Sequence, residues 1–536
     1  MRGFLKRYVS VVVWIGFFLL VLFLPLTRLL LSFRSADIKS ILVNAQVGKA
    51  IIHSVSTATA GTAISVSLAL TAAYCVNRTN IRFKSFFHIL LILPMFLPTV
   101  SHGTGMVILL GSNGILTKLL KQSVGIYGFW GIVFGSVLYA FPLAYLMFSD
   151  ILKYENYTPY EAAKVLGIPK KNQWGAISMP YLYKPTIGIV FSIFTTIVTD
   201  YGVPLAIGGL YKTLPVLMYE EVIGRLNFEK GCVFGSILLL PAVVAFFTDS
   251  LSQRYMLGDS SLKQFESEPN QTRDNVAYVF LILLTLCIVM PIASFLPVAF
   301  SENYPLNQDF TLSHWFYVFS TKNGFKYLMN SFIIALAVSI IGVCSAFACA
   351  YSTARVHRIK ILHFFSMMSL AVPGVVLGIS YVLLFKSSFL YGSFAILIMV
   401  NTIHFFASPY LMLYNSLGKL NANLESVAAS LRIDRVHLLW DIIIPQSKST
   451  LLEAFAYFFA NSMITISAIS FLVNRNTRPI SLMLTEFDAS QTLLAPTAVV
   501  SLVILICNLI MKGIVCLVKR RAGIGDRSAK NAVKKI

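Results

Sequence analysis

Long apolar runs constrain this chain more than any other feature of its sequence. A helix that spans a bilayer needs about 20 consecutive, mostly apolar residues, and such runs recur along the whole chain. They predict spans near residues 8–32, 51–75, 86–110, 127–150, 185–208, 231–252, 276–300, 328–352, 361–386, 390–414, 449–473 and 492–517. The sequence therefore predicts an all-α, polytopic membrane protein with about twelve transmembrane helices.

The composition agrees with a chain that lies mainly in lipid. Of its 536 residues, 57% are hydrophobic and only 12% are charged, whereas soluble domains carry about 25% charged residues. The formal net charge is +21, but Lys and Arg fall in short segments between apolar runs, where such residues set membrane topology. No basic stripe with interleaved aromatic residues occurs. The expected surroundings are therefore the lipid bilayer and not nucleic acid.

The seven cysteines give no sign of a disulfide framework or of a metal site. None belongs to a C-x-x-C pair, and most lie inside apolar runs, where a thiol acts as a small apolar side chain. The first apolar run follows a basic start, as in a signal peptide, but it is too long and no small-residue cleavage site follows. We interpret it as a retained first span.

The distribution of basic residues predicts the orientation in the membrane. Lys and Arg are enriched on the cytoplasmic side of membrane proteins. With the N-terminus in the cytoplasm, the same side receives the basic segments 78–84, 158–180, 253–275, 355–360 and 519–535. The opposite orientation would place nearly all of this charge outside. We therefore expect both termini to be cytoplasmic.

The chain consists of two similar halves. The tripeptide Tyr-Leu-Met at 145–147 recurs at 410–412, an offset of 410 − 145 = 265 residues. Earlier in each half, Arg78 and Arg355 follow the same Ala-Tyr pair by four residues. Internal repeats are common in transporters, where the substrate path lies at the repeat interface. The predicted organisation is a first transmembrane domain at 1–252, a cytoplasmic linker at 253–275, a second transmembrane domain at 276–518 and a basic tail at 519–536.

The polar segment 158–180, TPYEAAKVLGIPKKNQWGAISMP, stands out between apolar runs. It is typical of two short helices in succession. Thr158 is the candidate cap of the first helix, Glu161 would complete a capping box, and Gly167 suits the position just past its end. A second helical turn is expected from Pro169. A loop built in this way favours docking to another protein.

Six residues of this segment resemble the EAA loop of the permeases of binding-protein-dependent ABC importers. They are Glu161, Ala162, Ala163, Gly167, Ile177 and Pro180. In that family the loop forms a coupling helix that sits in a cleft of the cytoplasmic ATPase. The resemblance covers nearly the whole chain. It implies a permease of the type I importer fold in which two six-span domains, elsewhere separate chains, are fused.

The same resemblance implies the partners and the location. Cytoplasmic ATP-binding cassette subunits, in two copies, would dock on the coupling loops, and an extracytoplasmic solute-binding protein would deliver the solute. The chain would lie in the bacterial inner membrane as a multi-pass protein. No Walker A pattern G-x-x-x-x-G-K-[ST] occurs. We therefore expect no catalytic residue of its own, no cofactor and no metal.

The second coupling loop departs from the family pattern. At the offset of 265, the acidic residue and the glycine of the motif are replaced by Ser426 and Arg432. Asn423 is the candidate cap of its first helix and Asp434 stands where the second helix begins, so a capped two-helix shape is expected without the consensus chemistry. The residues that align with the motif are Ser426, Ala428, Ile442 and Pro445.

A few polar residues within the spans are candidates for the substrate path. An Asp at mid-bilayer costs roughly 2.5–3.5 kcal/mol, so Asp200 should face a cavity or a partner unless it lies near the outer end of its span and faces water. Gly202 and Pro204 could break the helix there, and free backbone groups belong beside a water-filled path. Ser and Thr in the matching second-half span more commonly bond their own helix or a neighbour, and His102 and His404 are interpreted as interior histidines. The candidate path residues are Asp200, Tyr201, Gly202, Ser462, Thr465 and Ser467.

Some stretches also resemble permeases of a known substrate class. Residues 199–209 and 219–249 are similar to the first half of fused permeases assigned to 2-aminoethylphosphonate uptake. The run at 462–474 is shared more widely, including with permeases for ferric iron. The expected substrate is a small solute, with 2-aminoethylphosphonate first and ferric iron, thiamine or a polyamine as alternatives.

Two other functional classes are compatible with a polytopic chain. A secondary transporter of the major facilitator type also has six plus six spans, but it would carry charged residues deep in several spans for ion coupling. The first predicted cytoplasmic loop, NRTNIRFKSF, also lacks the Gly- and Asp-bearing signature of that family. A membrane-embedded enzyme would need a constellation such as H-E-x-x-H or paired intramembrane carboxylates, and none stands out.

Overall fold

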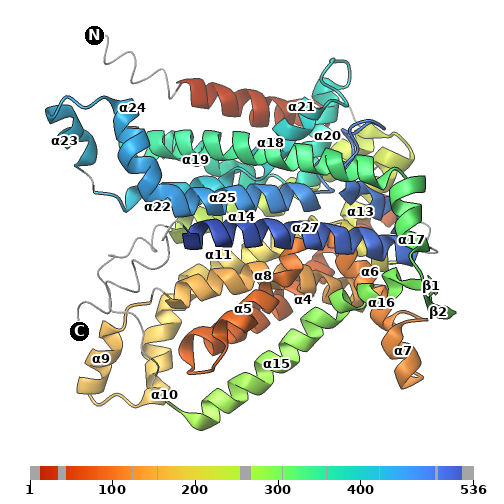
Figure 1. Cartoon of the computed structure of the whole chain (residues 1–536), viewed down its shortest axis with the longest axis horizontal. Coiled ribbons are helices and arrows are strands. Elements are labelled where there is room, and N and C mark those ends of the chain that lie inside the picture. Colours follow the sequence, from red (N-terminus) through yellow and green to blue (C-terminus); the bar gives the residue numbers. More distant parts are fainter. Residues whose placement is uncertain are drawn as a thin grey trace. The chain divides into compact units, whose positions relative to one another are not determined.

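The computed structural model describes residues 12–33, 41, 44–122, 125–153, 155–253, 267, 269–304, 306–357, 360–421, 423–488 and 493–521. Most of these residues are helical (Figure 1), which confirms the all-α prediction. One antiparallel hairpin interrupts the helices of the described part, formed by strands β1 (Ser301–Asn303) and β2 (Asn307–Phe310).

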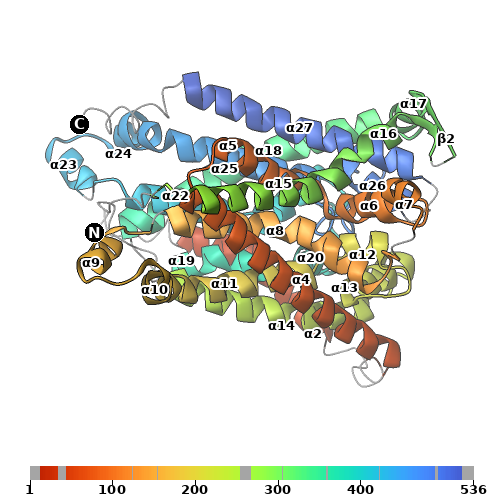
Figure 2. The same ribbon diagram turned by 90° about the horizontal axis from the view of Figure 1, so that it is seen from below.

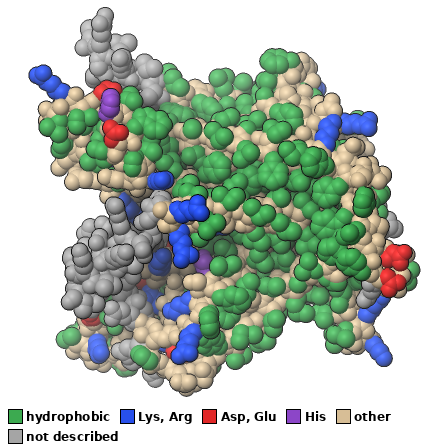
Figure 3. Space-filling view, viewed as in Figure 1, with side chains coloured by type: hydrophobic (Ala, Val, Ile, Leu, Met, Phe, Trp, Pro, Cys, Tyr) green, Lys and Arg blue, Asp and Glu red, His purple; other side chains and the backbone are tan. Residues whose placement is uncertain are grey.

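The membrane-spanning prediction is also confirmed. Eight helices among the described residues are long and apolar enough to cross a membrane, and two bent helix pairs raise this number to ten. Two further helices of 26 and 21 residues, α14 and α25, lie at the predicted positions 231–252 and 449–473. Hydrophobic side chains dominate the helix surfaces that face the viewer in Figure 3, as expected of helices in contact with lipid.

Residue contacts divide the chain into two compact units. The first unit holds residues 1–35, 323–482 and 503–536. Its described elements are η1 (Leu19–Phe23), α2 (Leu24–Phe33), α18 (Gly324–Tyr351), η6 (Ser352–His357), α19 (Lys360–Met367), η7 (Met368–Ala371), α20 (Gly374–Phe385), α21 (Phe394–His404), α22 (Ala407–Gly418), α23 (Leu424–Ser430), α24 (Arg435–Leu438), η8 (Leu439–Ile443), α25 (Ile444–Ile464), η9 (Ile480–Leu482) and the later part of α27 (Leu494–Arg521).

The second unit holds residues 36–322 and 483–502. Because these units group residues by contact and not by repeat, the predicted domain boundaries at 252 and 275 stay a prediction. The further elements of this unit are α4 (Ala45–Arg78), α5 (Lys84–Ile92), η2 (Leu93–Phe96), α6 (Thr99–Leu110), α7 (Ile115–Leu120), α8 (Phe129–Lys153), α9 (Thr158–Val165), α10 (Lys170–Gln173), η3 (Trp174–Ser178), α11 (Met179–Val198), α12 (Gly202–Ile207), α13 (Leu214–Tyr219), η4 (Glu220–Gly224), α14 (Phe228–Gln253), α15 (Gln271–Ala293), α16 (Phe295–Ala299), α17 (Ser313–Phe316), η5 (Tyr317–Thr321) and α26 (Met483–Asp488).

Proline interrupts three of the predicted spans, which are therefore not continuous helices. The run 86–110 stops at Pro98, and the run 361–386 bends by 102° between Ala371 and Gly374, around Pro373. The run 390–414 bends by 53° just before Pro409. Proline has no N–H to donate, and its ring clashes with the carbonyl four residues earlier, so an α-helix cannot pass through it unchanged. The breaks at Pro98 and Pro373 lie at matching places in the two halves of the chain, whereas α8 of the first half continues past Pro142 without a break.

Small residues determine how closely the long helices of the second unit pack. Helix α4 begins at Asn44, whose side chain accepts a hydrogen bond from the backbone N–H of Gln46, and runs for 34 residues. Its buried face carries Ala58, Ala69 and Ala72, which contribute to the same core as Ala140 of α8. Such residues let two helix backbones approach closely, which is how helices associate in lipid, where the hydrophobic effect does not favour one apolar surface over another.

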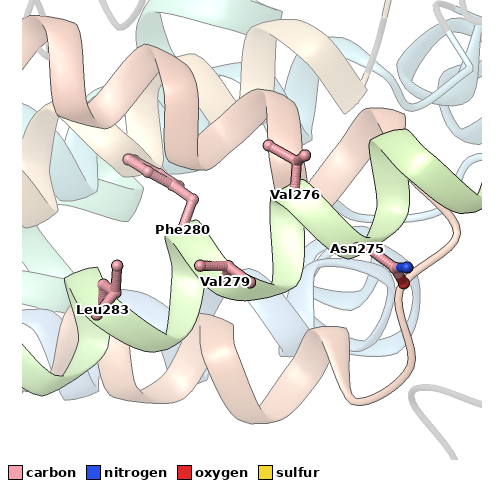
Figure 4. A pocket seen from close by; sticks show the side chains of 5 residues that line it. All are labelled: Asn275, Val276, Val279, Phe280 and Leu283. Atoms are coloured by element: carbon pink, nitrogen blue, oxygen red, sulfur yellow. The ribbon is translucent and has the colours of Figure 1, made fainter.

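Helix α15 carries an open apolar groove on its surface. Its lining consists of Asn275, Val276, Val279, Phe280 and Leu283, whose side chains are shown in Figure 4. The helix is 23 residues long, and Asn270 caps it by accepting a hydrogen bond from the backbone N–H of Arg273. A groove of this composition on a spanning helix fits contact with lipid acyl chains.

Candidate functional site

The first candidate loop extends beyond the ends of the long helices of its unit. Figures 1 and 2 show α9 and α10 past the ends of α8 and α11. Gly167 stands just past α9 with a φ of 71°, and its N–H bonds the carbonyl of Lys164 at 3.2 Å. The N–H of Ile168 bonds the carbonyl of Ala163 at 2.9 Å. Together these form a Schellman motif, so Gly167 has the place that the sequence predicted.

The second loop repeats this backbone although its sequence differs. Arg432 follows α23 with a φ of 56°, and its N–H bonds the carbonyl of Ala429 at 3.2 Å. The N–H of Ile433 bonds the carbonyl of Ala428 at 2.8 Å. A side chain in this left-handed region costs roughly 1–2 kcal/mol relative to glycine. The second loop therefore has the same backbone shape as the first, although Arg432 disfavours the positive φ that this shape requires.

The predicted caps of the first helix in each loop are wrong. Neither Thr158 nor Asn423 caps its helix through the side chain. The acceptors are instead Asn156, which takes the N–H of Thr158 at 3.0 Å, and Asn421, which takes the N–H of Asn423 at 2.9 Å. Since 421 − 156 = 265, both belong to the repeat, and that offset was the signal that could have identified them. Asp434 does act as predicted and accepts from the N–H of Val436 at 3.4 Å.

Each loop joins the following helix through a π-helical turn, η3 or η8. The N–H of Met179 bonds the carbonyl of Trp174, five residues earlier, and the N–H of Ile444 bonds that of Leu439. The prolines of the two motifs, Pro180 and Pro445, explain this turn. Neither can donate to the carbonyl four residues before it, so the turn widens by one residue.

The remaining motif residues differ in exposure. Ala163 and Ala428 are buried at the base of their helices, whereas Val165 is 88% exposed and Leu166 is 75% exposed. Leu431 and Trp440 of the second loop are 66% and 67% exposed. The other motif side chains are half-buried or exposed, namely Glu161, Ala162, Ile177, Pro180, Ser426, Ile442 and Pro445. Each loop thus combines a small buried side and an apolar outer side.

Asp200 lies at a break between two helices, as its neighbours Gly202 and Pro204 predicted. Helix α11 ends at Val198 and α12 begins at Gly202. The Asp200 carboxylate accepts hydrogen bonds from the N–H of Gly202 at 3.2 Å and of Val203 at 3.0 Å, and the Thr99 side chain also bonds it. The carboxylate therefore caps α12 and joins it to the start of α6. Tyr201 is buried and stacks on Tyr219 at a centroid distance of 4.9 Å.

The matching second-half residues occupy a similar break. Helix α25 ends at Ile464, and the hydroxyl of Thr465 bonds the carbonyl of Asn461 at 2.6 Å, which is bonding within its own helix, as we expected. The Thr465 carbonyl in turn accepts a hydrogen bond from the Ser481 hydroxyl at 2.7 Å. Ser462 is buried, and Ser467 is half-buried.

A close approach of two chain segments recurs at both breaks with the residue types exchanged. A Cβ at Gly202 would lie 2.0 Å from the Thr99 hydroxyl, at the start of α6. A Cβ at Gly374, at the start of α20, would lie 2.4 Å from the Ser467 hydroxyl. In each half one partner is glycine and the other carries a hydroxyl. The glycine lies in the later segment in the first half and in the earlier segment in the second half, but both halves keep the contact.

The two candidate histidines lie next to these breaks. His102 is buried in α6 and hydrogen-bonds the backbone at Pro94 and Leu97, where the predicted span is interrupted. His404 is half-buried at the end of α21, with its Nε2 near Gly374. Sequence reasoning missed two other histidines, one in each half, that hydrogen-bond the tyrosines of the repeated Tyr-Leu-Met tripeptide. The matched bonds join His88 Nδ1 to the Tyr145 hydroxyl at 2.9 Å and His363 Nδ1 to the Tyr410 hydroxyl at 2.7 Å.

No group of three or more His, Cys, Asp or Glu side chains in the described ranges lies close enough together to hold a metal ion. The loops can bind a partner, and the breaks can expose backbone polar groups within the membrane.

Comparison with known proteins identifies a family for both halves. The family described as "Binding-protein-dependent transport system inner membrane component" matches residues 61–255 and 342–524, which is more than half of the chain. The two matched regions contain the two candidate loops, one in each region. The first region also contains the helix break at Asp200, and the second contains the break at Thr465.

Individual relatives are permeases of transport systems. The ferric transport system permease protein FbpB of Actinobacillus pleuropneumoniae is 25% identical over 437 residues, covering 77% of this chain and 63% of the relative. This chain therefore spans less than two thirds of that relative. The Fe(3+)-transport system permease protein FbpB 2 of Haemophilus influenzae is 23% identical over 452 residues, covering 81% of this chain and 82% of the relative. The molybdenum transport system permease protein ModB of Haemophilus influenzae is 29% identical over 220 residues, covering 38% of this chain and 93% of the relative.

Proposed function

Because the chain belongs to the family of inner-membrane components of binding-protein-dependent transport systems, we propose that it forms the translocation path of an ATP-driven importer. The family matches once in each half, and the molybdenum permease is matched over 93% of its own length by only 38% of this chain. One fused chain would therefore supply both domains of such a path. The family assignment also disfavours the ion-coupled transporter and the membrane-embedded enzyme considered above.

The observation that carries this proposal is the shared backbone of the two loops. Both end their first helix in the same Schellman motif, at Gly167 and at Arg432, and both expose large apolar side chains. Exposed apolar side chains on an otherwise polar loop favour a protein partner. Burying them in a cleft would contribute about 25 cal/mol for each Å² of apolar surface removed from water.

The partners of these loops would be two copies of a cytoplasmic ATP-binding cassette subunit. ATP-driven closure of that pair would displace both loops and favour one of two states of the path, inward-open or outward-open. A ligand or partner can drive such a change only through a difference in free energy between the two states. A solute-binding protein outside the membrane would deliver the solute. With both loops in the cytoplasm, both termini would lie there too.

Ferric iron is the substrate that the relatives favour. Two of the relatives described above are named as ferric or Fe(3+) permeases, and neither they nor the molybdenum permease supports the expected 2-aminoethylphosphonate. In each half the solute path would include the helix break, where Asp200 in the first half and Thr465 and Ser467 in the second stand beside interrupted backbone. We assign Tyr201, Gly202 and Ser462 to the same path because they flank these breaks.

A pull-down from native membranes tests the permease assignment. The tagged chain should retain a cassette ATPase under gentle detergent conditions, and Glu161→Lys should weaken that association because it reverses a charge on the docking helix. The matched control is Lys212→Glu, which reverses a charge of the same unit outside the loop, between α12 and α13. An intact wild-type chain that retains no ATPase would contradict the assignment.

Uptake assays test the substrate. Cells that express the complete system should accumulate radiolabelled ferric iron, and an excess of 2-aminoethylphosphonate should leave this uptake unchanged. Competition by the phosphonate, together with uptake of the labelled phosphonate itself, would replace ferric iron as the substrate and leave the permease assignment intact.

A further inference from the structure

An arginine ties the first coupling loop to the end of a spanning helix. Arg78 is the last residue of α4 and forms an ion pair with Glu155, in the connection between α8 and α9. Both side chains are buried, with exposed fractions of 4% and 3%. A buried pair of this kind is far less screened by salt than a surface pair.

Two hydroxyls continue this link across the base of the loop. The Tyr160 hydroxyl donates to Glu155 Oε1 at 2.6 Å and lies 2.6 Å from the Ser178 hydroxyl. Burial and the neighbouring Glu155 carboxylate raise the pKa of Tyr160, so its phenol stays protonated and can donate. Tyr160 belongs to the first turn of the loop and Ser178 to its last turn. The network therefore closes the loop and fastens both of its ends to α4.

The second half makes the same link with different residues. Arg355, in η6 after α18, forms a two-pronged ion pair with Glu425 of α23 at 2.8 Å and 2.6 Å. Its guanidinium also donates to the carbonyls of Leu420 at 2.9 Å and Asn421 at 2.7 Å. A planar guanidinium is suited to this geometry because it offers several donors in fixed directions.

The acidic partner of the arginine has changed place between the halves. At the offset of 265, Glu425 stands where the first half has Tyr160, and Leu420 stands where it has Glu155. The arginine nevertheless contacts the base of the loop in both halves. Both halves thus keep an ion pair between the end of a long helix and the base of the loop, although the acidic residue differs in position. This indicates that the ion pair itself is required.

We propose that Arg78 and Arg355 are positioning residues that convert movement of the coupling loops into movement of the spanning helices α4 and α18. This inference rests on the proposed function, because it needs an ATPase that displaces the loops. Without the link, a loop could move with the ATPase while its helix stayed in place. ATP would then be hydrolysed with little transport.

The test compares solute transported with ATP hydrolysed by the complete complex in proteoliposomes. The variants are Arg78→Gln, Glu155→Gln and the pair of both, with ferric iron presented by the binding protein as the probe. Each should bind the ATPase like the wild type but lose about tenfold in transport per ATP, in the range of typical coupling between sites. The pair should lose no more than either single variant, because all three break one link.

Two controls separate positioning from folding. Arg225→Gln removes the ion pair between the exposed Arg225 side chain and Glu221 in the same unit and should leave transport per ATP unchanged. The reversed pair, Arg78→Glu with Glu155→Arg, should recover part of the lost ratio. A role in stability alone would lower the amount of protein in the membrane without changing transport per ATP.

The outcomes distinguish this inference from the proposed function. A wild-type chain that retains no ATPase would overturn both. If the wild type retains its ATPase and transports solute, but the double variant Arg78→Gln with Glu155→Gln shows unchanged transport per ATP, the positioning role alone would be overturned. If this double variant does not accumulate in membranes, Tyr160→Phe removes a single hydroxyl of the network and should still lower the ratio; an unchanged ratio there would also overturn the role.

Discussion

The contact between Gly202 and Thr99 gives the sharpest prediction for the helix breaks. In Gly202→Ala, the new Cβ would lie 2.0 Å from the Thr99 hydroxyl, 3.0 Å from its Cβ and 2.9 Å from the backbone nitrogen of Val100. Rotation of the Thr99 side chain relieves only the first of these contacts. The start of α12 must therefore shift away from α6.

The expected cost follows from two effects. Overpacking of a close contact typically costs about 1–3 kcal/mol, and the shift weakens the hydrogen bonds that the Asp200 carboxylate accepts from Gly202 and Val203. Hydrogen bonds to a charged group contribute about 1.5–3 kcal/mol each. A total near 3 kcal/mol would lower the unfolding temperature by roughly 6–12 °C for a unit of this size.

Thermal unfolding in detergent can be followed by the reaction of a fluorogenic dye with thiols that become accessible. Cys75 and Cys232 are buried in the same unit and would report its unfolding. The three exposed cysteines would be replaced by serine to remove their signal; they are Cys287, Cys344 and Cys516.

The double variant decides whether the reasoning is correct. Thr99→Gly makes room for the new Cβ, so Gly202→Ser with Thr99→Gly reproduces the arrangement of Gly374 and Ser467 in the second half. This double variant should cost about 0.5–3 kcal/mol less than the sum of the costs of Gly202→Ser and Thr99→Gly measured separately. Additive losses would show that the two residues do not limit each other and would refute the argument.

Three further predictions concern the coupling loops. Arg432→Gly should stabilise the second loop by about 1 kcal/mol by removing a side chain from a positive φ, and Gly167→Arg should destabilise the first loop by a similar amount, as measured by hydrogen exchange of the loop amides. Glu161→Lys should reduce uptake more than Ser426→Lys, because only the first loop carries the consensus acidic residue; equal losses would show that both loops contribute similarly. Asn156→Ala should cost the first loop about 1 kcal/mol through loss of its cap, seen as faster exchange at the start of α9, whereas unchanged exchange would exclude that role.

Much of the fold follows from local sequence. Apolar runs predict where helices cross the membrane, and the turn at Gly167 follows from the freedom of glycine at positive φ. Arg432 shows the limit of this reasoning. Its backbone has the same positive φ as Gly167, although an arginine by itself disfavours that conformation. The helix breaks at Pro98 and Pro373 were also missed, since an apolar run of sufficient length does not reveal whether its helix is continuous.

The contacts of the candidate site depend on residues that are far apart in the sequence. Arg78 and Glu155 are separated by 155 − 78 = 77 residues, and no local pattern marks them as partners. The repeat did single out Arg78 and Arg355, but only the fold shows what they bind. The cap residues Asn156 and Asn421 were overlooked for another reason: a threonine and an asparagine two residues later offered equally good caps.

The π-helical turns that precede α11 and α25 have a consequence for how these helices face their surroundings. Each turn holds one residue more than an α-helical turn, so every later residue is rotated by about 100° from the direction that a continuous α-helix would give it. The proline that follows each turn therefore determines which side chains of its spanning helix face which neighbours. Removal of one residue from such a turn would not shorten the helix noticeably, but it would present a different stripe of side chains to the neighbouring helices.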